Sequence, residues 1–233
     1  MQQTAENIDT YDELRSGLDH LLNGFGFYEG SGPDGVVFLQ IPQVPSSAIE
    51  QQIAKNLGYF VYPPQGLLYL AAVMEEVGID SHIVDLNRKV LIAAQKDKVN
   101  ILKAWQRQID LAILNYECPL IAISFMFDST RSQLNEVMAY IKRTYPQLCL
   151  VVGGVAATGD PESILRTKNA DLVFHNEGEG PLASFFAYVK DRNERVPNNI
   201  SFISSNGLMI QSNVVSGGEV DFDIRSQYNK LEI

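Results

Sequence analysis

The sequence has few cysteines, few histidines and no cluster of basic residues, and each shortage excludes a class of protein. Its two cysteines, Cys118 and Cys149, form no Cys-x-x-Cys pair, which argues against a disulfide framework and a thiolate metal site. Lys and Arg number 18 against 28 Asp and Glu, giving a net charge of −10, so a nucleic-acid backbone is an unfavourable partner. We predict no metal ligands and no catalytic side chain in this chain.

Long apolar runs are also missing. No run approaches the roughly 18 residues that a membrane span requires, so we predict no membrane span. Residues 1–11 are polar and acidic, unlike a signal peptide, and we expect a cytoplasmic protein. A hydrophobic fraction of 45% in 233 residues suits one α/β domain with extensions and a real core.

Short apolar runs alternate with amphipathic stretches along most of the chain. Strands are predicted at 36–41, 81–85, 120–125, 148–152 and 171–174, and helices at about 64–77, 90–108, 128–141, from 161, and 180–189. This alternation implies right-handed crossovers and a parallel sheet. The fold class is therefore α/β: a flavodoxin-like or Rossmann-like open parallel sheet of order 2-1-3-4-5, with helices on both faces and its switch point between strands 1 and 3.

Both ends of the chain carry additions to this core. Leucines at helical spacing predict an N-terminal helix at about 10–23, followed by a turn-rich linker, and Asn206-Gly207 predicts a β-hairpin over 200–212 that extends the sheet edge. We expect a helical extension with its linker at 1–34, the α/β domain at 35–216 and an extended tail at 217–233. The segment 42–64 is long for a loop and is expected to be functional or mobile.

Ligands of such sheets bind beyond the carboxyl ends of the strands. Gly153 and Gly154 remove side chains at one strand end, which either admits a ligand or merely permits a tight turn. Ser124 offers a hydroxyl at another strand end, or is only a satisfied polar residue. Glu177 and Glu179 diverge around a glycine, so we interpret them as capping a helix and complementing its dipole rather than as an acid–base pair.

Several segments together resemble the cobalamin-binding domains that precede a radical S-adenosylmethionine (SAM) domain. The resemblance covers about residues 36–230. It is carried by Pro63-Pro-Gln-Gly-Leu-Leu-Tyr-Leu-Ala-Ala72, Gly78-Ile-Asp-Ser-His-Ile-Val-Asp85, Ile121-Ala-Ile-Ser124, Val151-Val-Gly-Gly-Val-Ala-Ala-Thr158, Pro161-Glu162 and Asp171-Leu-Val-Phe-His-Asn-Glu-Gly-Glu179, in the family's order and spacing.

The resemblance implies cobalamin as cofactor and assigns its contacts. Ser124 and Gly153-Gly154 would line a slot for the nucleotide tail, and the loops after strands 1, 4 and 5 would face the corrin ring, whose breadth needs a flat floor. The cofactor-binding residues predicted in this way are Pro42, Gln43, Tyr62, Gly66, Ser124, Phe125, Met126, Gly153, Gly154, Val155, Ala156, Glu177, Gly178 and Glu179.

Three features depart from related corrinoid proteins. The Asp-x-His-x-x-Gly motif is absent after strand 1, and no histidine lies between 36 and 81, so the resemblance implies a corrinoid without that lower ligand; His82 and His175 are interpreted as non-ligands. Val155 stands where the family often has His. The Cys-x-x-x-Cys-x-x-Cys motif is absent, so this chain cannot hold the iron–sulfur cluster that cleaves SAM.

The leading hypothesis is therefore a cobalamin-binding module of a radical SAM enzyme that performs methyl transfer or ring formation. SAM and the [4Fe-4S] cluster would belong to a catalytic domain outside this sequence, and Val220-Asp-Phe-Asp-Ile-Arg resembles the linker into that domain. The alternative is a corrinoid-free scaffold or docking domain of the same fold. A flavodoxin or a receiver domain is disfavoured, because the segment 42–47 is a poor phosphate loop and Ser124 replaces the receiver aspartate.

Overall fold

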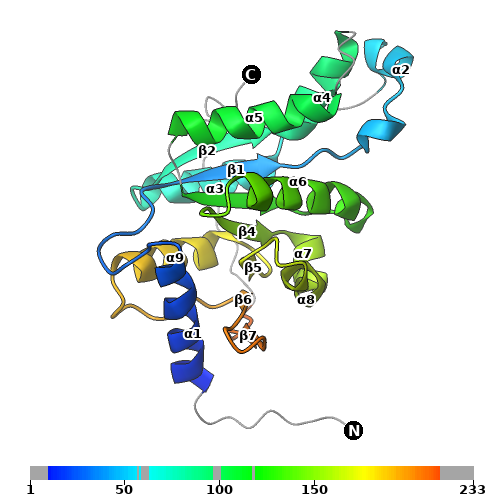
Figure 1. The fold of residues 1–233 in the computed structure, drawn as a ribbon. Helices are drawn as coiled ribbons and strands as arrows, with labels where there is room; N and C mark the ends of the chain where they lie inside the picture. Colours follow the sequence, from blue (N-terminus) through cyan, green and yellow to red (C-terminus); the bar gives the residue numbers. More distant parts are fainter. Residues whose placement is uncertain (1–9, 57, 59–62, 97–100, 117–118, 216–233) are drawn as a thin grey trace, which may run out of the picture.

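The computed structural model describes residues 10–56, 58, 63–96, 101–116 and 119–215, and its centre is one sheet (Figure 1). The strand order in this sheet is β2-β1-β3-β4-β5-β6-β7, parallel from β2 to β5 and antiparallel from β5 to β7. The predicted order 2-1-3-4-5 and the hairpin that extends its edge are confirmed. The strands are β1 Gly35–Gln40, β2 Asp80–Asp85, β3 Leu120–Ser124, β4 Cys149–Gly153, β5 Leu172–Phe174, β6 Ile200–Ile203 and β7 Met209–Gln211.

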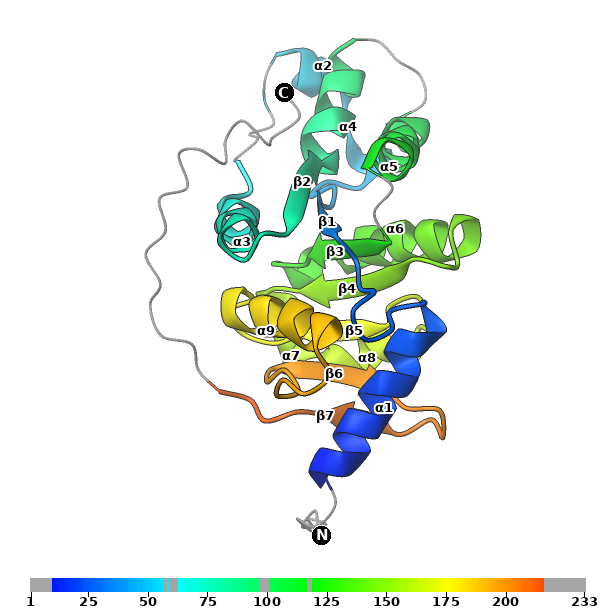
Figure 2. The same ribbon diagram turned by 90° about the vertical axis from the view of Figure 1, so that its left-hand side faces the viewer.

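Helices cover both faces of the sheet. Figure 2 shows α3 and α9 on one side and α5 and α6 on the other. Right-handed crossovers account for α3, α5 and α6, because the chain moves one way along the sheet from β1 to β2 and the other way from β2 to β3 and from β3 to β4. Within the described residues, no helix is both long and apolar enough to cross a membrane. The helices are α1 Thr10–Gly24, α2 Gln51–Lys55, α3 Gln65–Glu76, α4 Leu86–Gln95, α5 Ile101–Tyr116, α6 Arg131–Thr144, α7 Val155–Gly159, α8 Pro161–Arg166 and α9 Glu179–Lys190, with 3₁₀ turns η1 Ser46–Ala48 and η2 Asp128–Thr130.

Three local predictions need correction. The single helix expected at 90–108 is wrong, because α4 and α5 are separate helices that pack against each other. The earlier start of α4 follows from Asp85, whose side chain accepts a hydrogen bond from the backbone N–H of Arg88 and caps the helix. Pro64 occupies the N-cap position of α3 rather than its first turn. The short helix α7, directly after β4, was not predicted.

The N-terminal helix packs onto the domain. Three leucines of α1, at positions 14, 18 and 22, are buried in the common core. A Cβ at Gly17 would lie 3.0 Å from the ring of Phe202 on β6, so the glycine lets α1 lie directly on the hairpin. The Asp19 carboxylate accepts a 2.8 Å hydrogen bond from the Tyr188 hydroxyl of α9. The predicted extension therefore contributes to the same core as the sheet.

A nearly buried ion pair joins α6 to the start of β5. Lys142 Nζ lies 2.5 Å from Asp171 Oδ2, and the two side chains are only 12% and 15% exposed. The Asp171 carboxylate also accepts a 2.7 Å hydrogen bond from the Leu150 backbone N–H. Burial raises the pKa of Asp171, and the Lys142 charge opposes that rise. The pair therefore keeps an otherwise costly carboxylate ionised at the amino-terminal end of the sheet.

Replacing Lys142 alone is expected to destabilise the fold. Lys142→Met leaves the Asp171 charge buried without its partner, and we expect a loss of about 3 kcal/mol in the free energy of unfolding at pH 7, measured by urea denaturation. Because burial raises the pKa of the Asp171 carboxyl and the variant lacks the Lys142 charge that opposes this rise, the loss should shrink as the pH falls and the carboxyl takes up a proton. The double variant Lys142→Met/Asp171→Asn should recover most of the loss; equal losses in both variants would contradict this account.

Candidate functional site

The sheet face under α3 and α9 contains a trough. Alternate residues of neighbouring strands face the same side, and Phe38, Ala122 and Val151 are register partners across β1, β3 and β4. In the next row towards the carboxyl edge, Ser124 pairs with Gly153. The middle strands thus present the small side chains of this face, with bulkier residues on either side.

The trough is bounded by aromatic side chains. Phe38 on β1 and Phe174 on β5 stand at its two sides, and both are buried. Phe174 packs edge to face against Phe185 of α9, with ring centroids 5.7 Å apart, which fixes the orientation of that wall. Leu67 and Leu70 of α3 and Leu182 of α9 cover the trough. The result is a cavity of about 210 Å³ that opens at the carboxyl ends of the strands.

The backbone conformation beside the cavity requires a glycine at position 154. Its φ is +112°, and a Cβ at this position would lie 2.6 Å from the Phe125 carbonyl oxygen. That carbonyl accepts a hydrogen bond from Ala156 N–H, and Gly153 O accepts one from Phe125 N–H. Gly153 differs, because a Cβ there would meet only ordinary contacts at 3.8 Å with Phe174. Gly154 therefore fits the tight-turn interpretation, whereas Gly153 keeps the trough open.

Apolar side chains are exposed around the cavity mouth. Met126, Phe127 and Val155 are 42%, 58% and 69% exposed, and they follow β3 and β4 directly. Exposed apolar residues gathered at strand ends are typical of a surface that receives a ligand or partner. Asn176 and Glu177 line the mouth on the β5 side, just before α9 begins.

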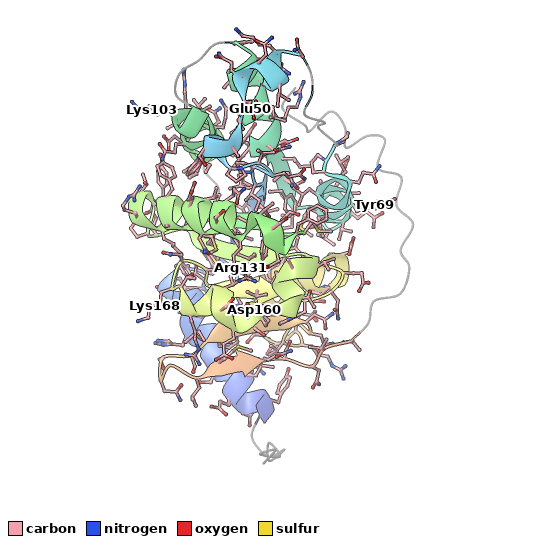
Figure 3. The ribbon with its side chains drawn as sticks, turned by 90° about the vertical axis from the view of Figure 1, so that its right-hand side faces the viewer. Glu50, Tyr69, Lys103, Arg131, Asp160 and Lys168 are labelled. Atoms are coloured by element: carbon pink, nitrogen blue, oxygen red, sulfur yellow. The ribbon has the colours of Figure 1, made fainter. Side chains whose placement is uncertain are left out.

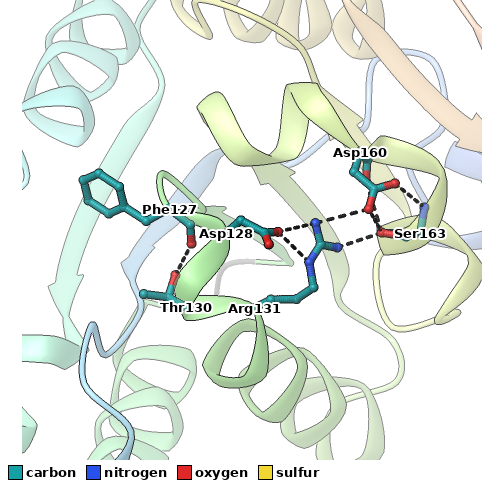
Figure 4. A network of polar contacts seen from close by, with 6 residues as sticks. All are labelled: Phe127, Asp128, Thr130, Arg131, Asp160 and Ser163. Carbon is teal, nitrogen blue, oxygen red and sulfur yellow. Dashed lines mark hydrogen bonds and ion pairs between the residues drawn. The ribbon is translucent and has the colours of Figure 1, made fainter.

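A polar network ties the loop after β3 to the start of α8 (Figure 4). The Arg131 guanidinium lies 2.6 Å from Asp128 Oδ1, 3.2 Å from Asp160 Oδ2 and donates a 2.7 Å hydrogen bond to Ser163 Oγ. Figure 3 shows Arg131 and Asp160 close together near the middle of the view, away from Tyr69 of α3, and their side chains are 3.2 Å apart. The Ser163 hydroxyl and the Arg131 charge lower the pKa of Asp160, so the carboxylate stays ionised. The network holds the loop that carries Met126 and Phe127.

The loop after β1 is anchored to α4. Asn87 is buried, and its side-chain oxygen accepts a 2.9 Å hydrogen bond from Gln43 N–H. Asp85, at the end of β2, is 6% exposed, and burial raises the pKa of its carboxyl. Asp85 caps α4 and Asn87 of that helix holds Gln43, so the helix fixes where the segment after β1 leaves the sheet edge.

The structure brings most of the predicted site residues together. Nine of them line the cavity, and four others do not: Pro42 and Phe125 are buried, Ala156 is half-buried and Gln43 is exposed. Tyr62 lies outside the described residues. The nine lining residues are Gly66, Ser124, Met126, Gly153, Gly154, Val155, Glu177, Gly178 and Glu179.

Glu179 lies in the first turn of α9, where its charge complements the helix dipole as predicted. The N-cap position is Gly178, which forms no side-chain hydrogen bond, so neither glutamate is itself the N-cap residue. His175 is buried, with Nε2 2.7 Å from Ser201 Oγ, and does not line the cavity. His82 stacks on Tyr116 near the amino end of β2, with ring centroids 3.4 Å apart.

Sequence reasoning missed the deep lining of the cavity. Apart from Asn176, which lies at the mouth, these residues are apolar and have the pattern of ordinary core positions, so only the small size of Ala122 beside Ser124 and Gly153 indicated a void. The missed residues are Phe38, Leu67, Leu70, Ala122, Ile123, Val151, Phe174, Asn176 and Leu182.

Comparisons with known proteins place this geometry in a family. The model of the B12 binding domain matches residues 53–186, which contain all of the cavity lining except Phe38. Among curated proteins, no sequence matches the chain.

Two radical SAM enzymes are among the solved structures that share the fold. The radical SAM methyltransferase TsrM from Kitasatospora setae, with cobalamin and a [4Fe-4S] cluster bound, has a TM-score of 0.55 at 12% identity, over 79% of this chain and 30% of that chain. The cobalamin-dependent SAM radical enzyme OxsB, with aqua-cobalamin bound, has a TM-score of 0.51 at 14% identity, over 78% and 22%. This chain thus spans less than a third of either protein, and at these identities the likeness shows the fold. The family match covers more than half of the chain, which belongs to the B12-binding domain family.

Proposed function

We propose that this chain binds cobalamin, with the nucleotide tail in the cavity and the corrin ring over the strand-end loops. The observation that supports this proposal most directly is the trough, in which Ala122, Ser124 and Gly153 leave space between Phe38 and Phe174. Its volume of about 210 Å³ is below the roughly 300–1,000 Å³ of sites for drug-sized ligands. The cavity therefore suits a narrow appendage such as the tail, while the macrocycle stays outside.

The chain's own residues would position the cofactor. Ser124 has a hydroxyl at the level where the tail passes the sheet edge, and Met126 and Val155 offer apolar contact to the ring. When bound, cobalamin supplies cobalt-centred methyl transfer or electron transfer. We further propose that Pro42, Gln43, Tyr62, Phe125 and Ala156 contribute through the loops that carry them, together with the nine lining residues. No lower histidine ligand from an Asp-x-His-x-x-Gly motif takes part, because the sequence has none.

We place this domain within a larger, cytoplasmic radical SAM enzyme that performs methyl transfer or ring-forming radical chemistry. The solved proteins of this fold are three to five times longer than the part that matches, which supports a separate catalytic domain holding SAM and the [4Fe-4S] cluster. The proposed division of this chain is 1–34 as helical extension, 35–216 as cobalamin-binding domain and 217–233 as linker. The strands of the sheet lie between residues 35 and 211, which supports the proposed bounds of the central domain.

A corrinoid-free docking domain is the second candidate. It is favoured by Val155, which replaces a frequent family histidine and is 69% exposed at the mouth. In that case the apolar mouth would contact a protein surface directly. The two candidates differ in whether the cavity is used.

Cobalamin retention separates these candidates. The purified chain is incubated with hydroxocobalamin, desalted and examined by visible absorbance, and we expect corrinoid to remain with the protein at about one equivalent. Loss of all corrinoid absorbance from the protein fraction would favour the docking domain instead.

Filling the trough should expel the tail. Gly153→Val places a side chain in the cavity, while valine suits a strand and meets no backbone clash. We expect hydroxocobalamin affinity to fall at least about tenfold, as small overpacking costs typically reach 1–3 kcal/mol, with cobinamide, which lacks the base, much less affected. Gly159→Val is the matched control, since Gly159 lies outside the cavity in open space. Equal effects of both variants on cobalamin affinity would contradict the placement of the tail.

Releasing the loop after β3 should weaken binding without unfolding the protein. Arg131→Met keeps a side chain that can pack on Phe125 but removes the contacts to Asp128, Asp160 and Ser163. We expect the dissociation constant (Kd) of hydroxocobalamin to rise about three- to tenfold, since a lost hydrogen bond typically costs roughly 0.5–1.5 kcal/mol and about 1.4 kcal/mol is tenfold in Kd, with an unchanged far-UV circular dichroism spectrum. Arg166→Met, which breaks only the exposed pair with Glu162, is the control and should bind normally.

A further inference from the structure

We propose that the deep end of the cavity selects corrinoids by their lower base, accepting benzimidazole or phenol bases and discriminating against adenine. The inference rests on the proposed function, because it concerns which tail the same cavity takes. It goes beyond cobalamin binding itself, since corrinoids with different bases share the same ring and cobalt.

The deep end has an entirely apolar lining of side chains. Its floor is Phe38, Ala122 and Val151, one row further from the carboxyl edge than Ser124 and Gly153. Its cover is Leu70 of α3 and Leu182 of α9. Leu70 follows Gly66, and Leu182 follows Gly178, by one helical turn. None of these side chains carries a hydrogen-bonding group.

The backbone N–H and C=O groups of these strands are already used in pairing with neighbouring strands. Phe38 pairs with Ile83 and Ala122 on its two sides, and Val151 pairs with Ala122 and Leu172, so the peptide groups of the floor belong to the sheet. On the cover, Leu182 N–H donates to Gly178 O within α9. The described residues of the deep end therefore offer no group to satisfy a polar base edge.

Among the lining residues that the structure describes, polar side chains occur only at the mouth. Ser124 lies one row nearer the edge, and the Asn176 amide there donates to Val215 O at 3.4 Å while its backbone N–H donates to Thr158 Oγ1 at 2.8 Å. A benzimidazole has a single free ring nitrogen, on the side of the base nearer its sugar, and its methylated edge is apolar. Such a base can turn that nitrogen towards Ser124 and bury the apolar edge against Leu70 and Leu182.

Adenine is matched poorly by this lining. It carries an exocyclic amine and further ring nitrogens at the edge that would lie deepest, and a buried polar group without a partner costs about 1–3 kcal/mol. A site that leaves polar groups of a ligand unpaired rejects that ligand by this free-energy penalty. The same penalty acts in pockets whose own buried polar groups are left unpaired by a ligand that lacks the partner. One such group alone corresponds to about a tenfold difference in Kd.

The test compares four corrinoids on the full chain by absorbance titration: cobalamin, the p-cresol cobamide, the adenine cobamide and cobinamide, all in the dicyano form, in which cyanide occupies both axial positions and no base is bound to the cobalt. We expect cobalamin and the p-cresol cobamide to bind within about threefold of each other and the adenine cobamide at least about tenfold more weakly. Equal or tighter binding of the adenine cobamide would overturn the inference.

Cobinamide distinguishes this failure from failure of the proposed function. If cobinamide binds as tightly as cobalamin, the tail contributes nothing and base selection is refuted, while corrinoid binding stands. If no corrinoid binds, both proposals fall. Tighter binding of cobalamin than of cobinamide, together with discrimination against adenine, supports both.

A polar substitution in the deep end should reduce the difference in affinity between cobalamin and the adenine cobamide. Leu70→Gln adds an amide to the cover at a half-buried position, and we expect the ratio of adenine cobamide Kd to cobalamin Kd to fall by at least about threefold. Tyr69→Gln, on the same helix but outside the cavity lining, is the matched control and should leave the ratio unchanged (Figure 3). An unchanged ratio in Leu70→Gln would count against selection by the lining.

Discussion

The site depends on one packing constraint: a space must persist inside a sheet-and-helix core that would otherwise close. Ala122 and Gly153 are too small to fill the gap between Phe38 and Phe174, and parallel strand pairing prevents the sheet from collapsing to compensate. At roughly 24 cal/mol per Å³, an unfilled cavity of about 210 Å³ forgoes on the order of 5 kcal/mol of packing, less whatever water at its mouth restores. A ligand that fills it recovers contacts the protein cannot make alone.

The rest of the structure keeps that space in place. The edge-to-face contact of Phe174 with Phe185 fixes one wall, and the close approach of Gly154 to the Phe125 carbonyl fixes the strand end above it. Arg131 joins the loop after β3 to α8, and Lys142 with Asp171 anchors the opposite end of the sheet. In the proposed function, the apolar interior receives the tail and the exposed apolar strand ends face the broad ring.

The fold could be predicted well because its signals are local. Continuous apolar runs and helical leucine spacing are read without knowing any partner, and they implied the order 2-1-3-4-5 and the added hairpin. The mouth of the site was also predictable, since Ser124, Gly153 and Glu179 depart from the core pattern at strand or helix ends. Leu70 and Leu182 were not, because a leucine that lines a cavity and one that packs in a core have the same sequence pattern. The separation of α4 from α5 was missed because both segments continue an apolar periodicity.

The central claim is that the cavity between the sheet, α3 and α9 receives the nucleotide tail of cobalamin. A crystal structure of the full chain with hydroxocobalamin tests it most directly. The account predicts density for the benzimidazole between Phe38 and Phe174, under Leu70 and Leu182, with the corrin ring outside over Met126 and Val155. A corrinoid seated elsewhere, or with its base outside a cavity filled by the protein's own side chains, would contradict it.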